Sequence, residues 1–250
     1  MNILMSTLNF SSKLNKFLNK IETETGRQIK FVESSDLGIR GITAAFQYHP
    51  SYILIVLDQE YPRAPEDIER SIAHEATHGY IIYKLGFCRT TFNSDVSDEY
   101  KRDVQLVLTM VEDIIVNKII SENGFPPYGH EYLPMVREEI KIARRGEKVG
   151  EEFYHKFAAT PHLEALLVIS RYIIAWGFLK FYQLEDKDEK LIHEFTNTFK
   201  KFYPNYYQFA GRIEKIIEVN DIFNGEKECE VVRKILKLFK MDQGVKLIRI

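Results

Sequence analysis

Cysteine is scarce in this chain of 250 residues. Only Cys88 and Cys229 are present, which is too few for a disulfide framework or for a Cys-type zinc site. The formal net charge is −2 and no strongly basic helix stands out, so nucleic acid is not expected as a partner. Because 45% of the residues are hydrophobic and 28% are charged, we expect a folded cytoplasmic protein with reduced thiols.

Long uninterrupted apolar runs are also missing. The most apolar stretch, residues 163–182, contains Glu164, Arg171 and Lys180, and a charge near the middle of a bilayer is costly. We therefore expect a buried helix there and no membrane span. The first twenty residues lack a basic start followed by an apolar run, so no signal peptide is predicted.

The hydrophobic spacing predicts an α+β front half and an all-helical rear half. Apolar residues recur at helical intervals in the first and last segments of the front half, and the segments between them have strand-like patterns. The predicted helices are 10–25, 65–85 and 97–121, and the predicted strands are 28–33, 39–48 and 52–58, with a hairpin turn at 49–51.

Two histidines four positions apart form the main functional motif, His74-Glu75-Ala76-Thr77-His78. On a helix both imidazoles lie on one face and can bind one metal ion. Glu75 then lies beside the metal, where it can take a proton from a water molecule. The flanking residues are uncharged, as expected for a helix buried against the core. The motif therefore predicts a zinc hydrolase with Glu75 as the general base.

A third ligand is expected from another element, since catalytic zinc usually has three protein ligands and a water. Glu112 is the predicted ligand, because its helical neighbours Leu108, Ile115, Val116 and Ile119 are all aliphatic. A carboxylate among such residues needs a partner, and a zinc ion would be one.

A short polar strip formed by Thr109, Asp113 and Asn117 runs beside Glu112 on the same predicted helix. We interpret Asp113 as a hydrogen-bond acceptor that orients a ligand histidine, with Asn117 beside it in the strip. The alternative is that Glu112 and Asp113 form ordinary ion pairs on a helix.

The motif together with Glu112, 34 positions after His78, resembles the gluzincin division of zinc metallopeptidases. The resemblance covers about residues 10–123 and is nearest to the small members called minigluzincins. It implies one Zn²⁺ held by His74, His78 and Glu112. It also implies a zincin-like core, with an N-terminal helix, a small mostly antiparallel sheet, the motif helix and the glutamate helix. We therefore predict a catalytic core at 1–134 and a helical region at 135–250 that closes the cleft.

In gluzincins the strand two elements before the motif helix lies at the sheet edge and often contains Asn-Ala-aromatic. Ala44, Ala45 and Phe46 occupy that place here, with Ala44 instead of the asparagine. The resemblance implies that this edge binds an extended peptide or protein substrate as an added strand. The alternative is an ordinary strand of the sheet.

A peptidase also needs a donor for the oxyanion of its tetrahedral intermediate. The candidates are Tyr128 and His130, in the loop after the glutamate helix, and His162 in the rear half.

Two other functions stay open from the sequence. A gluzincin-like regulator or vestigial peptidase would bind zinc and act as a partner-binding module. A helical scaffold with an accidental HExxH would bind no stoichiometric metal. The sequence does not predict the oligomeric state.

Overall fold

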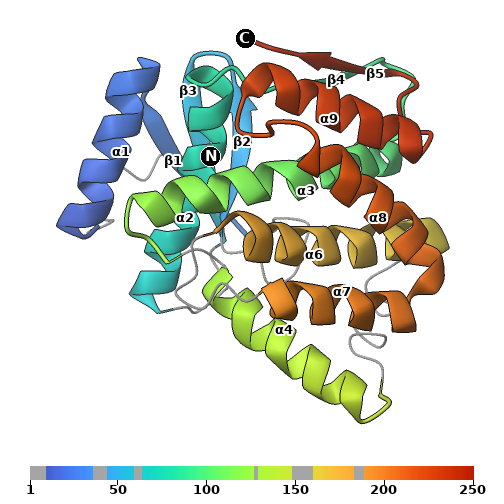
Figure 1. The fold of residues 1–250 in the computed structure, drawn as a ribbon. Helices are drawn as coiled ribbons and strands as arrows, with labels where there is room; N and C mark the ends of the chain where they lie inside the picture. The colour runs from blue at the N-terminus through green and yellow to red at the C-terminus, as the bar shows by residue number, and fades with distance from the viewer. Residues whose placement is uncertain (1–9, 36–43, 59–63, 127–128, 148–159, 183–188) are drawn as a thin grey trace. The chain divides into compact units, whose positions relative to one another are not determined.

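The computed structural model describes residues 10–35, 44–58, 64–126, 129–147, 160–182 and 189–250, and it confirms the predicted α+β class (Figure 1). The chain forms two compact units. Unit 1 contains residues 1–86, 119–127 and 250, and unit 2 contains residues 87–118 and 128–249. The predicted division near residue 134 differs from this one, since most of the second long helix belongs to unit 2.

Unit 1 consists of a small sheet, two helices and the end of a third. Its elements are α1 (Ser12–Thr25), β1 (Ile29–Ser34), β2 (Ala44–His49), β3 (Tyr52–Asp58) and α2 (Pro65–Tyr83), together with the last residues of α3 (Asp98–Glu122). The strand order is β1-β3-β2. The apolar strand β3 is therefore central and β2 lies at an edge, as predicted.

The predicted hairpin of β2 and β3 is confirmed, with His49 paired to Tyr52 across the turn. The expectation of a mostly antiparallel sheet is wrong, because β3 runs parallel to β1, with Ile29 opposite Ile53. Strand β3 lies between the other two strands. It runs antiparallel to β2 across the hairpin and parallel to β1, so one of the two strand pairs is parallel. Residues 39–43 of the predicted strand lie outside the described residues.

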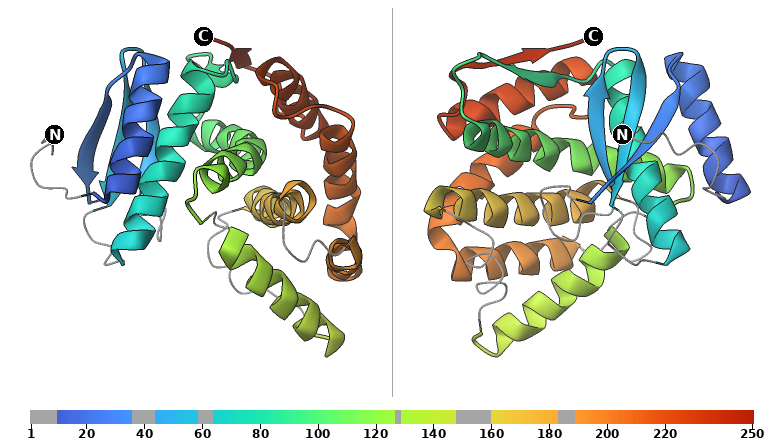
Figure 2. Two further views of the ribbon diagram at one scale, coloured as in Figure 1. Left: turned by 60° about the vertical axis from the view of Figure 1, so that its left-hand side comes forward. Right: turned by 180° about the vertical axis from the view of Figure 1, so that it is seen from behind.

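Helices α1 and α2 lie side by side (Figure 2). Ser11, the N-cap of α1, uses its backbone N–H and its hydroxyl to donate to the Glu69 carboxylate of α2, at 2.5 and 2.6 Å. At the other end of this pair, the Tyr80 hydroxyl of α2 donates to Glu24 of α1 at 2.7 Å. These polar contacts hold the motif helix in register with α1.

Unit 2 is mostly helical. Its elements are β4 (Arg89–Phe92), residues 98–118 of α3, α4 (Gly129–Arg144), α6 (Pro161–Phe181), α7 (Glu189–Phe202), α8 (Pro204–Glu218), α9 (Gly225–Leu238) and β5 (Val245–Ile248). The expectation of an all-helical rear half is wrong, because β5 pairs antiparallel with β4, Arg89 opposite Ile248. Gly244 has φ +69°, a conformation that glycine adopts without steric cost. It ends the turn that directly precedes β5.

Helix α6 is the apolar centre of unit 2. Its length and composition would allow it to cross a membrane, but 72% of its most apolar window is buried within the described structure. A side chain at Gly177 would collide with Ile114 of α3, and the Tyr182 hydroxyl donates to the Ile114 carbonyl at 3.0 Å. This packing is that of a core helix, as predicted.

Candidate metal centre

The HExxH residues lie in the middle of α2, and the sequence explains why this helix forms and where it packs. Pro65 occupies the first helical position, and Glu66 and Asp67 lie in the first turn. Their negative charges stabilise the helix by interacting with the positive end of its dipole. Directly after the motif, a Cβ at Gly79 would lie 2.9 Å from the Ile53 side chain of β3. The glycine therefore allows α2 to approach the sheet closely.

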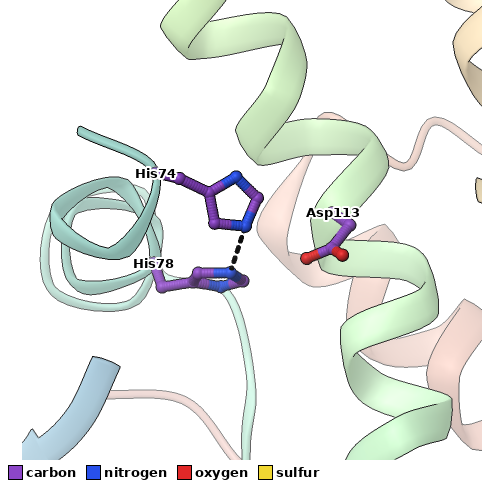
Figure 3. A group of neighbouring side chains, drawn as sticks. All are labelled: His74, His78 and Asp113. Atoms are coloured by element: carbon purple, nitrogen blue, oxygen red, sulfur yellow. Dashed lines mark hydrogen bonds between the residues drawn. The ribbon is translucent and has the colours of Figure 1, made fainter. Parts of the chain in front are cut away.

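The two motif histidines form a buried pair on one face of α2. His74 and His78 are 5% and 7% exposed, and their Nε2 atoms are 3.2 Å apart (Figure 3). A tetrahedral zinc ion with bonds of about 2.0–2.1 Å holds two nitrogen ligands about 3.3 Å apart. The spacing of the pair in unit 1 therefore suits two ligands of one zinc ion.

The motif glutamate is held by the edge strand of the sheet. The backbone N–H of Phe46 in β2 donates to Oε2 of Glu75 at 2.7 Å, and the Phe46 ring stacks against His78 with a centroid distance of 6.4 Å. Because this N–H points to Glu75 rather than to β3, it faces the free edge of the sheet. Of the predicted substrate-binding residues, Phe46 thus contacts the site, whereas Ala44 is buried in the core.

The polar residues of α3 lie in unit 2. Glu112 and Asn117 are buried and Asp113 is half-buried. The negative charge of Glu112 acts on Glu228 of α9: burial raises the pKa of Glu228 well above its ordinary value, and the charge of Glu112 raises it further. Within unit 2, the Glu112 carboxyl therefore lies close to a second buried carboxyl, which sequence reasoning did not foresee.

Figure 3 draws His74 and His78 of unit 1 and Asp113 of unit 2, three residues of types that can bind a metal ion. Each residue offers one ligand atom, a ring nitrogen or a carboxylate oxygen. The sequence predicted Glu112 as the third ligand, and Asp113 follows it directly in the chain. The two are adjacent on α3, and aliphatic neighbours alone do not distinguish which one faces a metal.

The predicted oxyanion donors are described only in part. Tyr128 and the side chain of His130, in the first turn of α4, lie outside the described residues. The side chain of His162 is 51% exposed, at the start of α6, and its Nε2 is 3.9 Å from Oδ2 of Asp103. That contact gives His162 a role as a partner of Asp103 within unit 2.

Comparison with known protein families, curated proteins and solved structures finds no match to this chain.

Proposed function

We propose that this chain is a zinc-dependent peptidase in which His74 and His78 bind the metal and Glu75 is the general base. The observation that carries the proposal is the buried pair of Nε2 atoms 3.2 Å apart, next to a glutamate held at the sheet edge. Peptide or protein substrates and a cytoplasmic location belong to the same proposal.

Zinc would supply Lewis-acid chemistry at this place, lowering the pKa of water and polarising the scissile carbonyl. The chain would supply the proton transfers. Glu75 would take a proton from the attacking water and later give it to the leaving amine. The hydrogen bond from the Phe46 N–H to Oε2 would fix the orientation of Glu75 as the base.

The edge strand β2 would bind the substrate backbone. In an antiparallel pair, every second residue of the edge strand directs its backbone N–H and C=O away from the neighbouring strand. Ala44 and Tyr48 therefore direct these groups to the same side as Phe46, away from β3. An extended peptide added to this side would lie alongside Glu75, whose carboxylate accepts a hydrogen bond from the Phe46 N–H of β2. The geometry within unit 1 thus supports β-augmentation as the way of binding substrate.

For the third ligand we propose a carboxylate of α3, that of Asp113 or that of Glu112, with Asn117 one turn further along the helix. A carboxylate oxygen is a usual zinc ligand beside two histidines. Glu112 is the residue expected from the sequence, but its charge acts on Glu228 inside unit 2. Asp113→Asn should therefore lower zinc affinity more than Glu112→Gln does, as measured by competition with a zinc chelator. The opposite order would return the role to Glu112.

The central experiment combines metal analysis with activity on a denatured protein substrate. Glu75→Gln should keep one zinc at the histidines and lower the turnover rate by about 10²–10⁴-fold, the usual contribution of a general base. Glu66→Gln is the matched control, because Glu66 lies exposed in the first turn of the same helix. It should retain both the zinc and the activity.

Three other results would contradict the peptidase proposal. Zinc bound at the histidines without turnover in the parent would favour the partner-binding module. No zinc at the histidines would favour the helical scaffold. Equal activity of parent and Glu75→Gln would remove Glu75 from the reaction.

A further inference from the structure

A second cluster of metal-ligand side chains lies entirely within unit 2. Cys88 precedes β4, and Glu228 and Cys229 follow one another near the start of α9. All three are buried, at 0%, 0% and 6% exposure, and their ligand atoms lie within 4.8 Å of one another. Two thiols and a carboxyl thus meet in the protein interior although 140 positions separate Cys88 from Glu228.

Glu228 has an unused ligand atom in this cluster. Its Oε2 accepts a hydrogen bond from the Cys88 backbone N–H at 3.2 Å. Its Oε1 is buried and has no hydrogen-bond partner among the described residues. A buried carboxylate oxygen without a partner costs free energy, and the nearby charge of Glu112 increases that cost. A bound cation would remove both penalties.

The two thiols have the chemistry of a zinc site. Neither cysteine forms a disulfide. Thiolates are preferred ligands of zinc, and tetrahedral zinc holds two sulfurs about 3.8 Å apart at Zn–S bonds of about 2.3 Å. A small adjustment of the side chains would reach that geometry.

We propose that Cys88, Cys229 and Glu228 bind one Zn²⁺ ion that serves a structural role in unit 2. The ion would tie the β4–β5 sheet to α9. That sheet has only two strands, and a two-stranded sheet is marginally stable by itself. Two thiolates and one carboxylate carry three negative charges, two of which the Zn²⁺ ion would neutralise. The proposal does not depend on the peptidase function.

Cobalt substitution tests this site without reference to activity. Co²⁺ bound by thiolates gives an intense near-ultraviolet charge-transfer band, which histidine and carboxylate ligands do not produce. The full chain, kept reduced and titrated with Co²⁺, should show this band, and Zn²⁺ should abolish it. His78→Ala should leave the band unchanged, which separates this site from the histidine pair.

Variants of the cluster assign the ligands. Cys229→Ser should abolish or strongly weaken the band, and Glu228→Gln should lower Co²⁺ affinity by more than about 10-fold. Glu226→Gln, an exposed glutamate in the same first turn of α9, is the matched control and should bind Co²⁺ as the parent does. Far-ultraviolet circular dichroism checks that each variant is folded.

The absence of a charge-transfer band in the reduced parent chain would overturn the proposal, and this result requires no variant. A band that Glu228→Gln leaves at full affinity would remove the carboxylate from the site. A Cys88–Cys229 disulfide that persists after purification under reducing conditions would likewise contradict a zinc site.

Discussion

The histidine pair of unit 1 and the cysteine cluster of unit 2 are both buried groups of candidate metal ligands, but they differ in how the chain builds them. His74 and His78 lie one turn apart on a single helix, and a sheet edge contacts the glutamate between them. Cys88 and Glu228 come from distant segments and are fully buried. The first arrangement suits a site that substrate must reach, and the second suits a buried site whose metal joins distant segments and so contributes to folding.

The largest difference between the two sites should be seen when one ligand is removed from each. His78→Ala should abolish peptidase activity and leave the thermal unfolding of unit 2 nearly unchanged. Cys229→Ser should retain much of the activity and destabilise unit 2 by several kcal/mol, because the binding energy of structural zinc contributes to folding. Activity assays and calorimetry of both variants provide the check. If the two variants show the same pattern, the distinction between catalytic and structural zinc is wrong.

The next effect concerns the packing that positions the histidine pair. Gly79→Ala should destabilise the protein by about 1–3 kcal/mol, because the added methyl group would lie 2.9 Å from the Ile53 side chain. Gly211→Ala in α8 is the matched control, since its Cβ would meet Tyr207 at an ordinary 3.5 Å. It should be neutral or stabilise by up to about 1 kcal/mol. Urea unfolding of both variants measures the difference, and equal destabilisation would show that the approach of α2 to β3 is not tight.

The smallest expected effect is a pH dependence in unit 2 that involves neither site. Burial raises the pKa of Glu214 above its ordinary value of 4.5, although a hydrogen bond from Tyr172 partly opposes this. The folded protein therefore binds this proton more tightly than the unfolded chain does. The resulting stability is present below the unfolded pKa and is lost as the pH rises through the folded pKa.

Glu214→Gln should accordingly gain stability relative to the parent as the pH rises from about 4 toward 7. The measurement is urea unfolding of both proteins across this range. A stability difference that does not change with pH would mean that Glu214 titrates alike in the folded and unfolded chains.

The sequence was most informative where the evidence is local. The i, i+4 spacing predicted that His74 and His78 share a helix face, and the predicted helices 10–25 and 65–85 agree with α1 and α2 to within two residues at each end. The turn predicted at residues 49–51 likewise indicated the β2–β3 hairpin. In each case the signal depends on a few neighbouring residues, whose geometry is set by the backbone alone.

The sequence was least informative where distant segments meet. Cys88 and Cys229 were interpreted as isolated thiols, and no pattern in either segment indicates that 140 residues of chain return Glu228 to the Cys88 backbone. The pairing of β4 with β5 was missed for the same reason, since β5 is only four residues long. Tertiary packing sets such contacts, and a short segment read alone has no information about its partner.

The most direct test of the account is a crystal structure of the zinc-loaded protein with anomalous scattering measured at the zinc edge. We predict a peak about 2.1 Å from Nε2 of both His74 and His78, with an acidic side chain of α3 as a further ligand. A zinc-saturated crystal without a peak at the two histidines would contradict the proposal that this chain is a zinc peptidase.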